Sequence, residues 1–576
     1  MRSLCLLLAM TLFAAPLFAS NPIPTIDQPL VPTSVPPGSG PFVLTVNGSA
    51  FVSGAVVNWN GKPLKTQFVS QRRLRALVPG TDVVRATTAS ITVTNPATGG
   101  PSFAVFFTVT VPTPSVTFAA LPGFTVGTSI TQVAAADFNN DGKMDLAVLY
   151  QGTQYTCSNG TVGSNYISSY LGNGDGTFTA AGSLQLDCSA LDGNENYAFT
   201  VANFTNDGYP DLAVSFTGTE CCFDFGRFVA VYPGNGDGTF SALPTSIAGS
   251  VGDEGGPATA GDFNGDGNLD VEVEGADLGS VLWFLQGASN GTLGIGGTTE
   301  LDPAGDFAGL WLAAGDFNND GILDIVTPEV DAGTPTILLG IGDGTFIPAP
   351  SQPALSLSAP AIGDFNGDDN LDLAFAGPAA TELSVLLGNG DGTFTVENNA
   401  PNNGPYATPL TADLNGDGKL DLAAGQILLG NGDGTFQAGI NIGAGSEAAI
   451  ADFNGDGRLD LVTVAGNSIT ILLQAGTSIP SPSSLKFPRR PVGTTSAAKP
   501  ITLTNSGSAT LQISSLSISG DFEGTNNCGS TLAIGQSCQI DVVFKPTAIG
   551  LRTGNITIAG NGASNPQLIP LSGTGY

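Results

Sequence analysis

Asp452-Phe453-Asn454-Gly455-Asp456-Gly457-Arg458-Leu459-Asp460-Leu461-Val462-Thr463 is the stretch that decides the fold, because close versions of it recur six more times upstream. Carboxylate or amide side chains occupy positions 1, 3, 5 and 9 of this loop, and Gly occupies position 6. A short apolar run follows at once. The loop is therefore expected to open onto a β-strand and not onto a helix.

The repeat spacing indicates blades of a propeller. The other copies begin at Asp137, Asn203, Asp262, Asp316, Asp364 and Asp413, so that successive starts lie 66, 59, 54, 48, 49 and 39 residues apart. These drifting distances fit blades of four strands each. The sequence predicts an all-β protein, and the many Gly (79) and Pro (38) residues fit short strands joined by tight turns.

The loops carry the oxygen ligands that Ca²⁺ takes, six to eight at a time. Turn formation alone is the alternative, since Asp, Asn and Gly are all turn formers. Carboxylates at positions 5 and 9 of all seven copies favour the metal. With position 7 acting through its backbone carbonyl, the predicted ligands are Asp137, Asn139, Asp141, Lys143, Asp145, Asn203, Thr205, Asp207, Tyr209, Asp211, Asp262, Asn264, Asp266, Asn268, Asp270, Asp316, Asn318, Asp320, Ile322, Asp324, Asp364, Asn366, Asp368, Asn370, Asp372, Asp413, Asn415, Asp417, Lys419, Asp421, Asp452, Asn454, Asp456, Arg458 and Asp460.

Two copies depart from the pattern. The second has Asn203 and Thr205 at positions 1 and 3, so its site should be weaker. The fifth has Asp369 at position 6, where a positive φ is expected, and Asp tolerates that conformation better than most residues.

A second motif, LGNGDGTF, stands between the loops. Its versions end at Phe178, Phe240, Leu293, Phe346, Phe394 and Phe436. Asn-Gly and Asp-Gly favour tight turns between strands. We interpret its acidic residues as turn residues first and as extra ligands second; they are Asp175, Asp237, Asp343, Asp391 and Asp433.

The seventh copy has no such motif after it, but the missing piece stands at the other end of the region. Residues 116–122 match residues 238–244, which lead into the third copy. We expect this N-terminal strand to complete the last blade, closing a ring of seven blades and removing its exposed edges.

The repeated DFNGDGxxDL and GNGDGTF motifs resemble the FG-GAP/VCBS repeat family, whose blades also build the integrin alpha-chain head and some lectins. The resemblance spans residues 113–476. It implies a calcium-binding propeller used for extracellular recognition, occasionally as the scaffold of a polysaccharide-degrading enzyme.

The segment before the repeats divides into two parts. Residues 1–20 read as a secretory signal peptide, with one Arg, an apolar run and small residues near Ala19. Residues 21–112 contain LTVNGSAF, VVNWNG and ITVTNPATGG, which resemble an IPT/TIG immunoglobulin-like domain. We expect Trp59 to pack in its core, and the basic cluster Arg72, Arg73 and Arg75 to be a solvated edge.

Residues 477–576 alternate apolar and polar residues over at least five segments. FPRRPVGTTS, ITLTNSG and VVFKPTAIG resemble the immunoglobulin-like choice-of-anchor D and ASH-type domains. Export makes Cys528 and Cys538 the best disulfide candidates. The pairing of the other four stays open; they are Cys157, Cys188, Cys221 and Cys222. The predicted fold is thus a seven-bladed β-propeller flanked by two immunoglobulin-like β-sandwich domains.

Composition narrows the function. The chain has no His, which excludes Ser-His-Asp nucleophiles and His-ligated zinc. A net charge of −32 argues against nucleic acid and anionic membranes as partners. No second apolar span of about 20 residues follows the signal peptide, so the mature chain is expected to lack a transmembrane segment.

These observations predict a secreted, cell-surface or periplasmic calcium-binding protein that recognises or adheres to an extracellular protein or glycan without being an enzyme. One alternative is a lectin using Trp283 or Trp311, although both stand in strand-like runs typical of a core. Another is a lyase or glycosidase, which needs acidic residues converging on a cleft. The local cluster available for it is Asp253, Glu254, Glu272 and Glu274.

Overall fold

The computed structural model describes residues 23–576 with these gaps: 27–28, 85–86, 97–100, 103, 111, 114, 157–161, 187–191, 220–224, 242–245, 252–254, 277–279, 303–310, 329–334, 350–358, 377–382, 398–408, 443–445, 475–477, 482–483, 506–510, 534–535 and 561–566. The predicted signal peptide and the four cysteines without a predicted pairing lie outside the described residues. Strands make up nearly all the regular structure, as the sequence predicts. Among the described residues there is one short 3₁₀ helix, η1 (Gly80–Val83), and no helix is long and apolar enough to cross a membrane.

The N-terminal sandwich packs two sheets face to face. Its first sheet has the order β1 (Thr25–Ile26), β3 (Phe42–Ser49), β7 (Arg73–Val78), β6 (Lys65–Ser70). Its second has the order β2 (Ser34–Val35), β9 (Val105–Val109), β8 (Thr87–Thr94), β4 (Val56–Trp59), β5 (Lys62–Pro63). Trp59 is 2% exposed, and its ring centroid lies 5.3 Å from that of Phe107, which confirms its predicted packing role.

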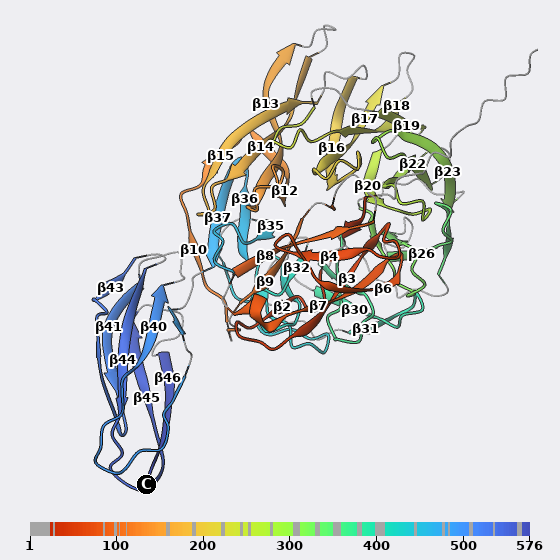
Figure 1. Ribbon diagram of the computed structural model, residues 1–576. Helices are drawn as coiled ribbons and strands as arrows, with labels where there is room; N and C mark the ends of the chain where they lie inside the picture. The colour runs from red at the N-terminus through yellow and green to blue at the C-terminus, as the bar shows by residue number, and fades with distance from the viewer. Residues whose placement is uncertain are drawn as a thin grey trace, which may run out of the picture.

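Seven sheets follow and form the ring (Figure 1). Blade 1 contains β12 (Ser129–Ala136), β13 (Asp145–Thr156), β14 (Val162–Gly172) and β15 (Phe178–Gln185). Blade 2 contains β16 (Asp192–Ala202), β17 (Asp211–Thr219), β18 (Phe225–Tyr232) and β19 (Ser246–Val251). Blade 3 contains β20 (Gly255–Gly261), β21 (Asp270–Ala276), β22 (Ser280–Gly287) and β23 (Leu293–Asp302). Blade 4 contains β24 (Ala313–Gly315), β25 (Asp324–Pro328), β26 (Pro335–Gly340) and β27 (Phe346–Pro348). Blade 5 contains β28 (Ala361–Gly363), β29 (Asp372–Ala376), β30 (Leu383–Gly388) and β31 (Phe394–Glu397).

Blades 6 and 7 complete the ring. Blade 6 contains β32 (Leu410–Ala412), β33 (Asp421–Ala423) and β34 (Ile427–Leu428). Blade 7 has the order β10 (Phe118–Ala120), β37 (Ser468–Gln474), β36 (Asp460–Ala465), β35 (Ser446–Ala451), with β11 (Phe124–Thr125) also on β37. Strand β10 pairs antiparallel with β37, opposing Phe118 to Gln474. This pairing confirms that a strand from before the repeats completes the last blade.

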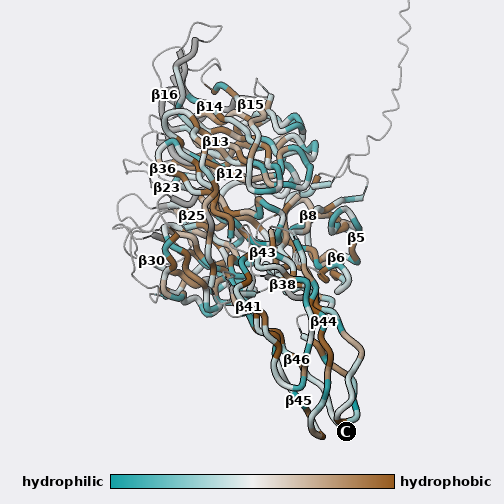
Figure 2. Tube along the Cα trace, turned by 90° about the vertical axis from the view of Figure 1, so that its left-hand side faces the viewer, coloured by the Kyte–Doolittle hydropathy of each residue, from teal (hydrophilic) through white to brown (hydrophobic). Residues whose placement is uncertain are grey.

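Alternating side chains build the contacts between blades. Along β13, Leu146 and Val148 pack against blade 7, while Ala147 and Leu149 pack against blade 2. Because both faces of each blade are covered, the strands read as nearly continuous apolar runs. Figure 2 shows these hydrophobic stretches along the strands of the ring and of the C-terminal sandwich.

The C-terminal sandwich also consists of two sheets and projects away from the ring (Figure 1). One has the order β38 (Ser478–Ser481), β40 (Lys499–Asn505), β44 (Ser537–Phe544), β42 (Phe522–Asn526), and the other β39 (Leu485–Lys486), β46 (Gln567–Gly575), β45 (Gly550–Gly560), β41 (Leu511–Ile518), β43 (Thr531–Leu532). Cys528 and Cys538 form a disulfide with their Cα atoms 5.0 Å apart, as predicted.

Aromatic pairs fasten neighbouring blades together. The Phe at loop position 2 meets, nearly edge-on and at 5.3–5.9 Å, the Phe that ends the GDGTF turn of the next blade. The pairs are Phe138–Phe240, Phe263–Phe346, Phe317–Phe394, Phe365–Phe436 and, across the closure from blade 7 to blade 1, Phe453–Phe178. At the closure the amide of Gly176 also donates to the carbonyl of Phe453 at 3.0 Å. The turn motif is therefore a contact between blades as well as a turn.

We predict that Phe453→Ala lowers the free energy of unfolding of the ring by about 3–5 kcal/mol, because it leaves a cavity at the closure. Chemical denaturation followed by tryptophan fluorescence measures the change. The control is Ile295→Ala, whose side chain is 61% exposed and whose loss should cost less than about 0.5 kcal/mol. Equal effects of the two substitutions would contradict a role for the pair in closure.

Candidate functional site

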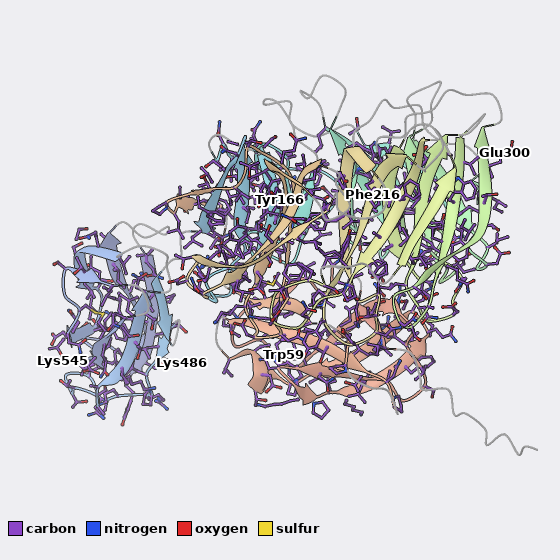
Figure 3. All side chains as sticks on the ribbon, turned by 90° about the horizontal axis from the view of Figure 1, so that it is seen from above. Trp59, Tyr166, Phe216, Glu300, Lys486 and Lys545 are labelled. Atoms are coloured by element: carbon purple, nitrogen blue, oxygen red, sulfur yellow. A yellow bond between two sulfur atoms is a disulfide. The ribbon has the colours of Figure 1, made fainter. Side chains whose placement is uncertain are left out.

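The predicted metal ligands lie in seven loops, each joining the first two strands of a blade. We number the loops 1 to 7 by their first residues, which are Asp137, Asn203, Asp262, Asp316, Asp364, Asp413 and Asp452. The N-terminal sandwich lies against the ring (Figure 3, where Trp59 marks the sandwich), and it forms hydrogen bonds with loops 3, 6 and 7. The loops and the sandwich thus share one face of the ring.

Position 9 fastens each loop to its own blade. This Asp is fully buried in all seven loops. In loop 4, Asp324 Oδ2 accepts from the amide of Phe317 at 2.8 Å, and Asp324 Oδ1 accepts from the amide of Gly340 at 2.9 Å. Gly340 ends the third strand of the blade, so one carboxylate joins the loop to that strand. Corresponding pairs of bonds recur at Asp145, Asp270, Asp372, Asp421 and Asp460. At Asp211 the loop donor is instead the amide of Thr205, at position 3.

The close approach of the third strand explains the first Gly of LGNGDGTF. A Cβ on Gly340 would lie 2.2 Å from the carbonyl oxygen of Leu323, at position 8 of the loop. Only Gly fits at such a distance. Blade 7 lacks the motif and has Gln474 at the position equivalent to Gly340. The backbone amide of Gln474 donates to Asp460 Oδ1 at 2.8 Å.

Burial raises the pKa of the position-9 carboxyl groups. Removal from water is the first cause, and neighbouring carboxylates of the same loop add to it. The pKa is about 6 for Asp211, about 7 for Asp145, Asp324 and Asp372, about 8 for Asp270 and Asp421, and well above the ordinary value for Asp460. Negative charge in these loops is therefore costly without a counter-charge.

Positions 1, 3 and 5 close each loop on itself. In loop 1, Asp137 accepts from the amides of Asp141 (3.0 Å) and Gly142 (2.8 Å), and its burial raises its pKa. Asn139 Oδ1 accepts from the amide of Asp141, and Asp141 Oδ1 accepts from the amide of Lys143, at position 7. The carboxylate at position 5 is thus turned toward its own downstream amide. Within the residues that the structure describes, no three His, Cys, Asp or Glu side chains gather closely enough to hold a metal ion.

The donor chemistry nevertheless fits a hard cation in every loop but the second, since Asp, Asn, Asp and Asp at positions 1, 3, 5 and 9 each offer a side-chain oxygen. In loop 3, Asp262 Oδ1 is buried and has no hydrogen-bond partner among the described residues, leaving a lone pair for an ion. Loop 2 fits poorly. Asn203 has a buried Nδ2 without an acceptor in the described structure, and Thr205 Oγ1 donates to Asp211. In loop 5, Asp369 has the expected positive φ, at 70°.

The acidic residues of the second motif are turn residues, as interpreted from the sequence. Asp175 Oδ1 accepts from the amide and the hydroxyl of Thr177, at 3.0 and 2.5 Å, and these bonds lower the Asp175 pKa. The same two bonds form at Asp237, Asp343, Asp391 and Asp433.

Loop 7 contains a cationic side chain of its own. Arg458, predicted as a carbonyl ligand at position 7, has its side chain 4% exposed, and its guanidinium donates to Gln474 Oε1 at 3.4 Å. The charges of Asp456 and Asp460 act on it and oppose the lowering of its pKa by burial.

The prediction that Arg72 belongs to a solvated edge was wrong. Its Nη2 donates to the backbone carbonyl of Asp262 at 2.6 Å. Burial raises the pKa of Asp262 and of Asp316, and the charge of Arg72 opposes that rise. The guanidinium therefore faces loops 3 and 4 across the contact between sandwich and ring. The positive charge of Arg72 suits a strand that packs on the acidic loops of the ring. The sequence alone did not show that the strand packs there.

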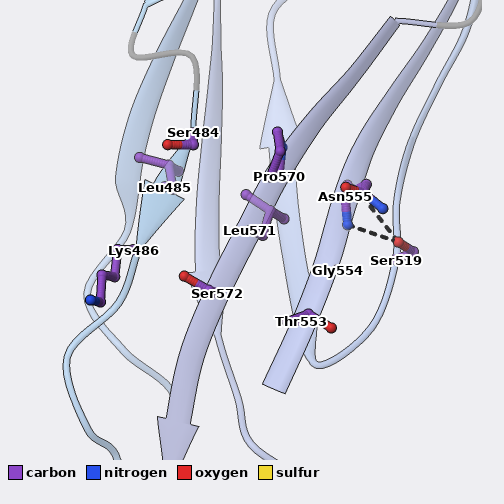
Figure 4. A pocket seen from close by; sticks show the side chains of 10 residues that line it. All are labelled: Ser484, Leu485, Lys486, Ser519, Thr553, Gly554, Asn555, Pro570, Leu571 and Ser572. Carbon is purple, nitrogen blue, oxygen red and sulfur yellow. Dashed lines mark hydrogen bonds between the residues drawn. The ribbon is translucent and has the colours of Figure 1, made fainter. Parts of the chain in front are cut away.

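The residues proposed for the alternative functions lie in or near cores. Glu272 and Glu274 are 0% and 1% exposed on β21, while Asp253 and Glu254 lie outside the described residues. Trp311 is 5% exposed and packs on Phe375. A hollow in the C-terminal sandwich is lined by polar and apolar residues such as Lys486, Ser519, Asn555 and Leu571, without a cluster of acidic side chains among its lining (Figure 4).

Comparison with known families finds the repeats and the last domain. Residues 221–273 and 364–424 match the FG-GAP-like repeat, and residues 129–162 match the FG-GAP repeat. Residues 481–574 match the HYDIN/CFA65/VesB-like Ig-like domain. The chain therefore carries FG-GAP repeats and an Ig-like domain. The IPT/TIG and choice-of-anchor D resemblances stay predictions, and no curated protein matches the chain.

Solved structures match the chain only distantly. An auxiliary nutrient binding protein from Bacteroides ovatus ATCC 8483 is 11% identical, covers 79% of this chain and 99% of its own, and has a TM-score of 0.29. The V. cholerae biofilm matrix protein Bap1 is 12% identical, with 78% and 76% covered and a TM-score of 0.27. The NanB sialidase from Streptococcus pneumoniae is 10% identical, with 75% and 83% covered and a TM-score of 0.33. TM-scores this low support no statement about function.

We predict that Asp324→Ala destabilises the ring by about 2–6 kcal/mol even in excess chelator, because it leaves two buried amides without an acceptor. Thermal unfolding in EGTA measures the change, with the exposed turn variant Asp343→Ala as control, expected to lose about 1 kcal/mol or less. An Asp324→Ala protein as stable as wild type in EGTA, and weaker only with calcium, would mean that position 9 acts solely as a ligand.

Proposed function

We propose that the protein is a calcium-binding propeller for extracellular recognition or adhesion, with no enzymatic activity, in which calcium stabilises the blades. The observation that carries the proposal is the repeated set of side-chain oxygens at positions 1, 3, 5 and 9, including the buried Asp262 Oδ1, which has no partner among the described residues. Calcium would be held by the side chains at positions 1, 3 and 5, the carbonyl at position 7 and the carboxylate at position 9.

Charge supports the same proposal. The chain carries a net charge of −32, and the loops crowd carboxylates into partly buried sites where they repel one another. A divalent cation in a loop removes that repulsion and ties both ends of the loop together. Since this requirement explains much of the acidity, the charge says little about the identity of a partner.

Two observations support action outside the cytoplasm. The Cys528–Cys538 disulfide is typical of proteins that mature in an oxidising compartment. The N-terminal 20 residues have the pattern of a secretory signal peptide. The proposed partner is an extracellular protein or a glycan.

Calcium should raise the melting temperature, and EGTA should lower it. At about ten times Kd, each weak extracellular-type site contributes about 1.4 kcal/mol. Magnesium should replace calcium poorly, because it demands a tighter octahedral site. Scanning calorimetry with calcium, with magnesium and with EGTA measures the shift, and the control is Asp343→Asn in the turn motif, which should keep the full calcium gain. An unchanged melt of protein confirmed to be metal-free would refute a structural role for calcium.

We expect the mature protein to be retained on an extracellular glycan or protein without releasing soluble sugars. The measurement is incubation with a panel of polysaccharides and cell-wall preparations, with calcium and with EGTA, scoring both retention and reducing ends released. Retention that needs calcium supports recognition by the folded ring. Release of sugars would overturn the non-enzymatic proposal.

A further inference from the structure

One row of residues crosses the edge of the N-terminal sandwich that faces loops 6 and 7. Ser34 on β2 and Thr88 on β8 both oppose Thr108 on β9, so they lie two strand spacings apart, about 10 Å. The Ser34 hydroxyl donates to Asp413 Oδ2, and the Thr88 hydroxyl donates to Asp452 Oδ2. One row of residues across a single sheet therefore binds the first carboxylates of two adjacent loops.

Hydrogen bonds occupy all the acceptor sites of these two carboxylates. Asp413 accepts from the amides at positions 4, 5 and 6 of its own loop, at 2.8, 3.0 and 2.9 Å, and from the hydroxyls of Thr33 and Ser34. Asp452 accepts from the same three loop positions, at 2.8, 3.1 and 2.9 Å, and from the Thr88 hydroxyl. A carboxylate offers about four acceptor sites. Neither Asp413 nor Asp452 retains one for a cation.

Loops 1 and 4 differ in this respect. Asp137 and Asp316 each accept from the amides at positions 5 and 6, and the amide of Asn140, at position 4, also interacts with Asp137. About one or two of the four acceptor sites therefore remain free on these carboxylates. In loop 5, Asp364 accepts from the amides at positions 4, 5 and 6, which leaves about one site free. Asp262 in loop 3 accepts from the amide at position 6 and keeps one oxygen without a partner in the described structure.

Backbone contacts close loops 6 and 7 from the outside. A Cβ on Gly416 would lie 2.3 Å from Thr110 Cγ2, and a Cβ on Gly457 would lie 2.7 Å from the amide nitrogen of Thr87. The amide of Thr113 also donates to the carbonyl of Asn415 at 2.8 Å. In loop 7, the buried Arg458 already places a positive charge beside the carboxylates of positions 5 and 9.

We propose that loops 6 and 7 are docking sites for the N-terminal sandwich and hold no calcium, so that calcium is confined to loops 1, 3, 4 and 5. The assignment of calcium to the open loops rests on the proposed function. The docking of the sandwich through Ser34 and Thr88 does not.

Counting the bound calcium ions tests which loops hold calcium. Native mass spectrometry of the mature protein in saturating calcium should find about four ions per chain, and not seven. Asp137→Asn and Asp316→Asn, in open loops, should each lose one ion, whereas the matched variants Asp413→Asn and Asp452→Asn should lose none. Loss of one ion from Asp413→Asn or from Asp452→Asn would overturn the proposal.

Hydrogen exchange on the full chain tests the docking of the sandwich on loops 6 and 7. The Ser34→Ala/Thr88→Ala double variant should speed amide exchange in β2 and β8 about tenfold, because it removes two hydrogen bonds to buried carboxylates. The control is Ser90→Ala, on the same strand as Thr88, whose backbone amide donates to Asn60 Oδ1 within the sandwich, and it should leave exchange unchanged. Equal exchange in the double variant and wild type would overturn the docking role.

The two tests separate the two ideas. A wild-type chain that binds no calcium would refute the proposed function, and the exchange experiment would still decide the docking. A chain with seven calcium ions would support the proposed function and refute the inference.

Discussion

The buried carboxylate at position 9 is the interaction on which the ring depends. It accepts one amide from the loop and one amide from the end of the third strand, and it does so in every blade. Burying a charged group is costly, but once its partners are buried, removing the acceptor leaves two unsatisfied donors, each at about 1–3 kcal/mol. The bond fixes where the loop stands on its blade. In six blades the third strand comes so close to the loop at this bond that Gly stands there, whereas blade 7 makes the same bond with Gln474.

The two repeated motifs act together because of this geometry. The first Gly of the turn motif serves the position-9 bond within a blade, and its final Phe serves the contact with the preceding blade. Phe453 and Phe178 make that contact across the closure, where β10 completes blade 7. A ring closed in this way has no free edge at its last blade. The loop that appears to be only a metal-binding motif is thus first a structural fastener.

The remaining oxygens of the loops are put to different uses around the ring. In loops 1 and 4 the first carboxylate keeps free acceptor sites, while in loops 6 and 7 hydroxyls of the N-terminal sandwich fill them. Arg72 supplies a positive charge at the other side of the same contact, facing loops 3 and 4. An acidic face of this kind can hold either cations or a neighbouring domain that offers hydrogen-bond donors.

Local patterns in the sequence predicted most of the fold. Seven loop copies indicated seven blades, the match of residues 116–122 to 238–244 predicted the closing strand, and the Asp-Gly turns had the expected role. Contacts between distant segments could not be predicted. Ser34 and Thr88 look like ordinary strand residues, and the hydrogen bonds that make them important reach about 379 and 364 residues along the chain. The solvated-edge interpretation of Arg72 failed for the same reason.

The most direct test is a crystal grown in calcium, with anomalous scattering used to locate the ions. Anomalous peaks are predicted inside loops 1, 3, 4 and 5, and no peaks inside loops 6 and 7. Loops without any peak in saturating calcium would contradict the calcium proposal, and peaks beside Asp413 or Asp452 would contradict the division between open and docked loops.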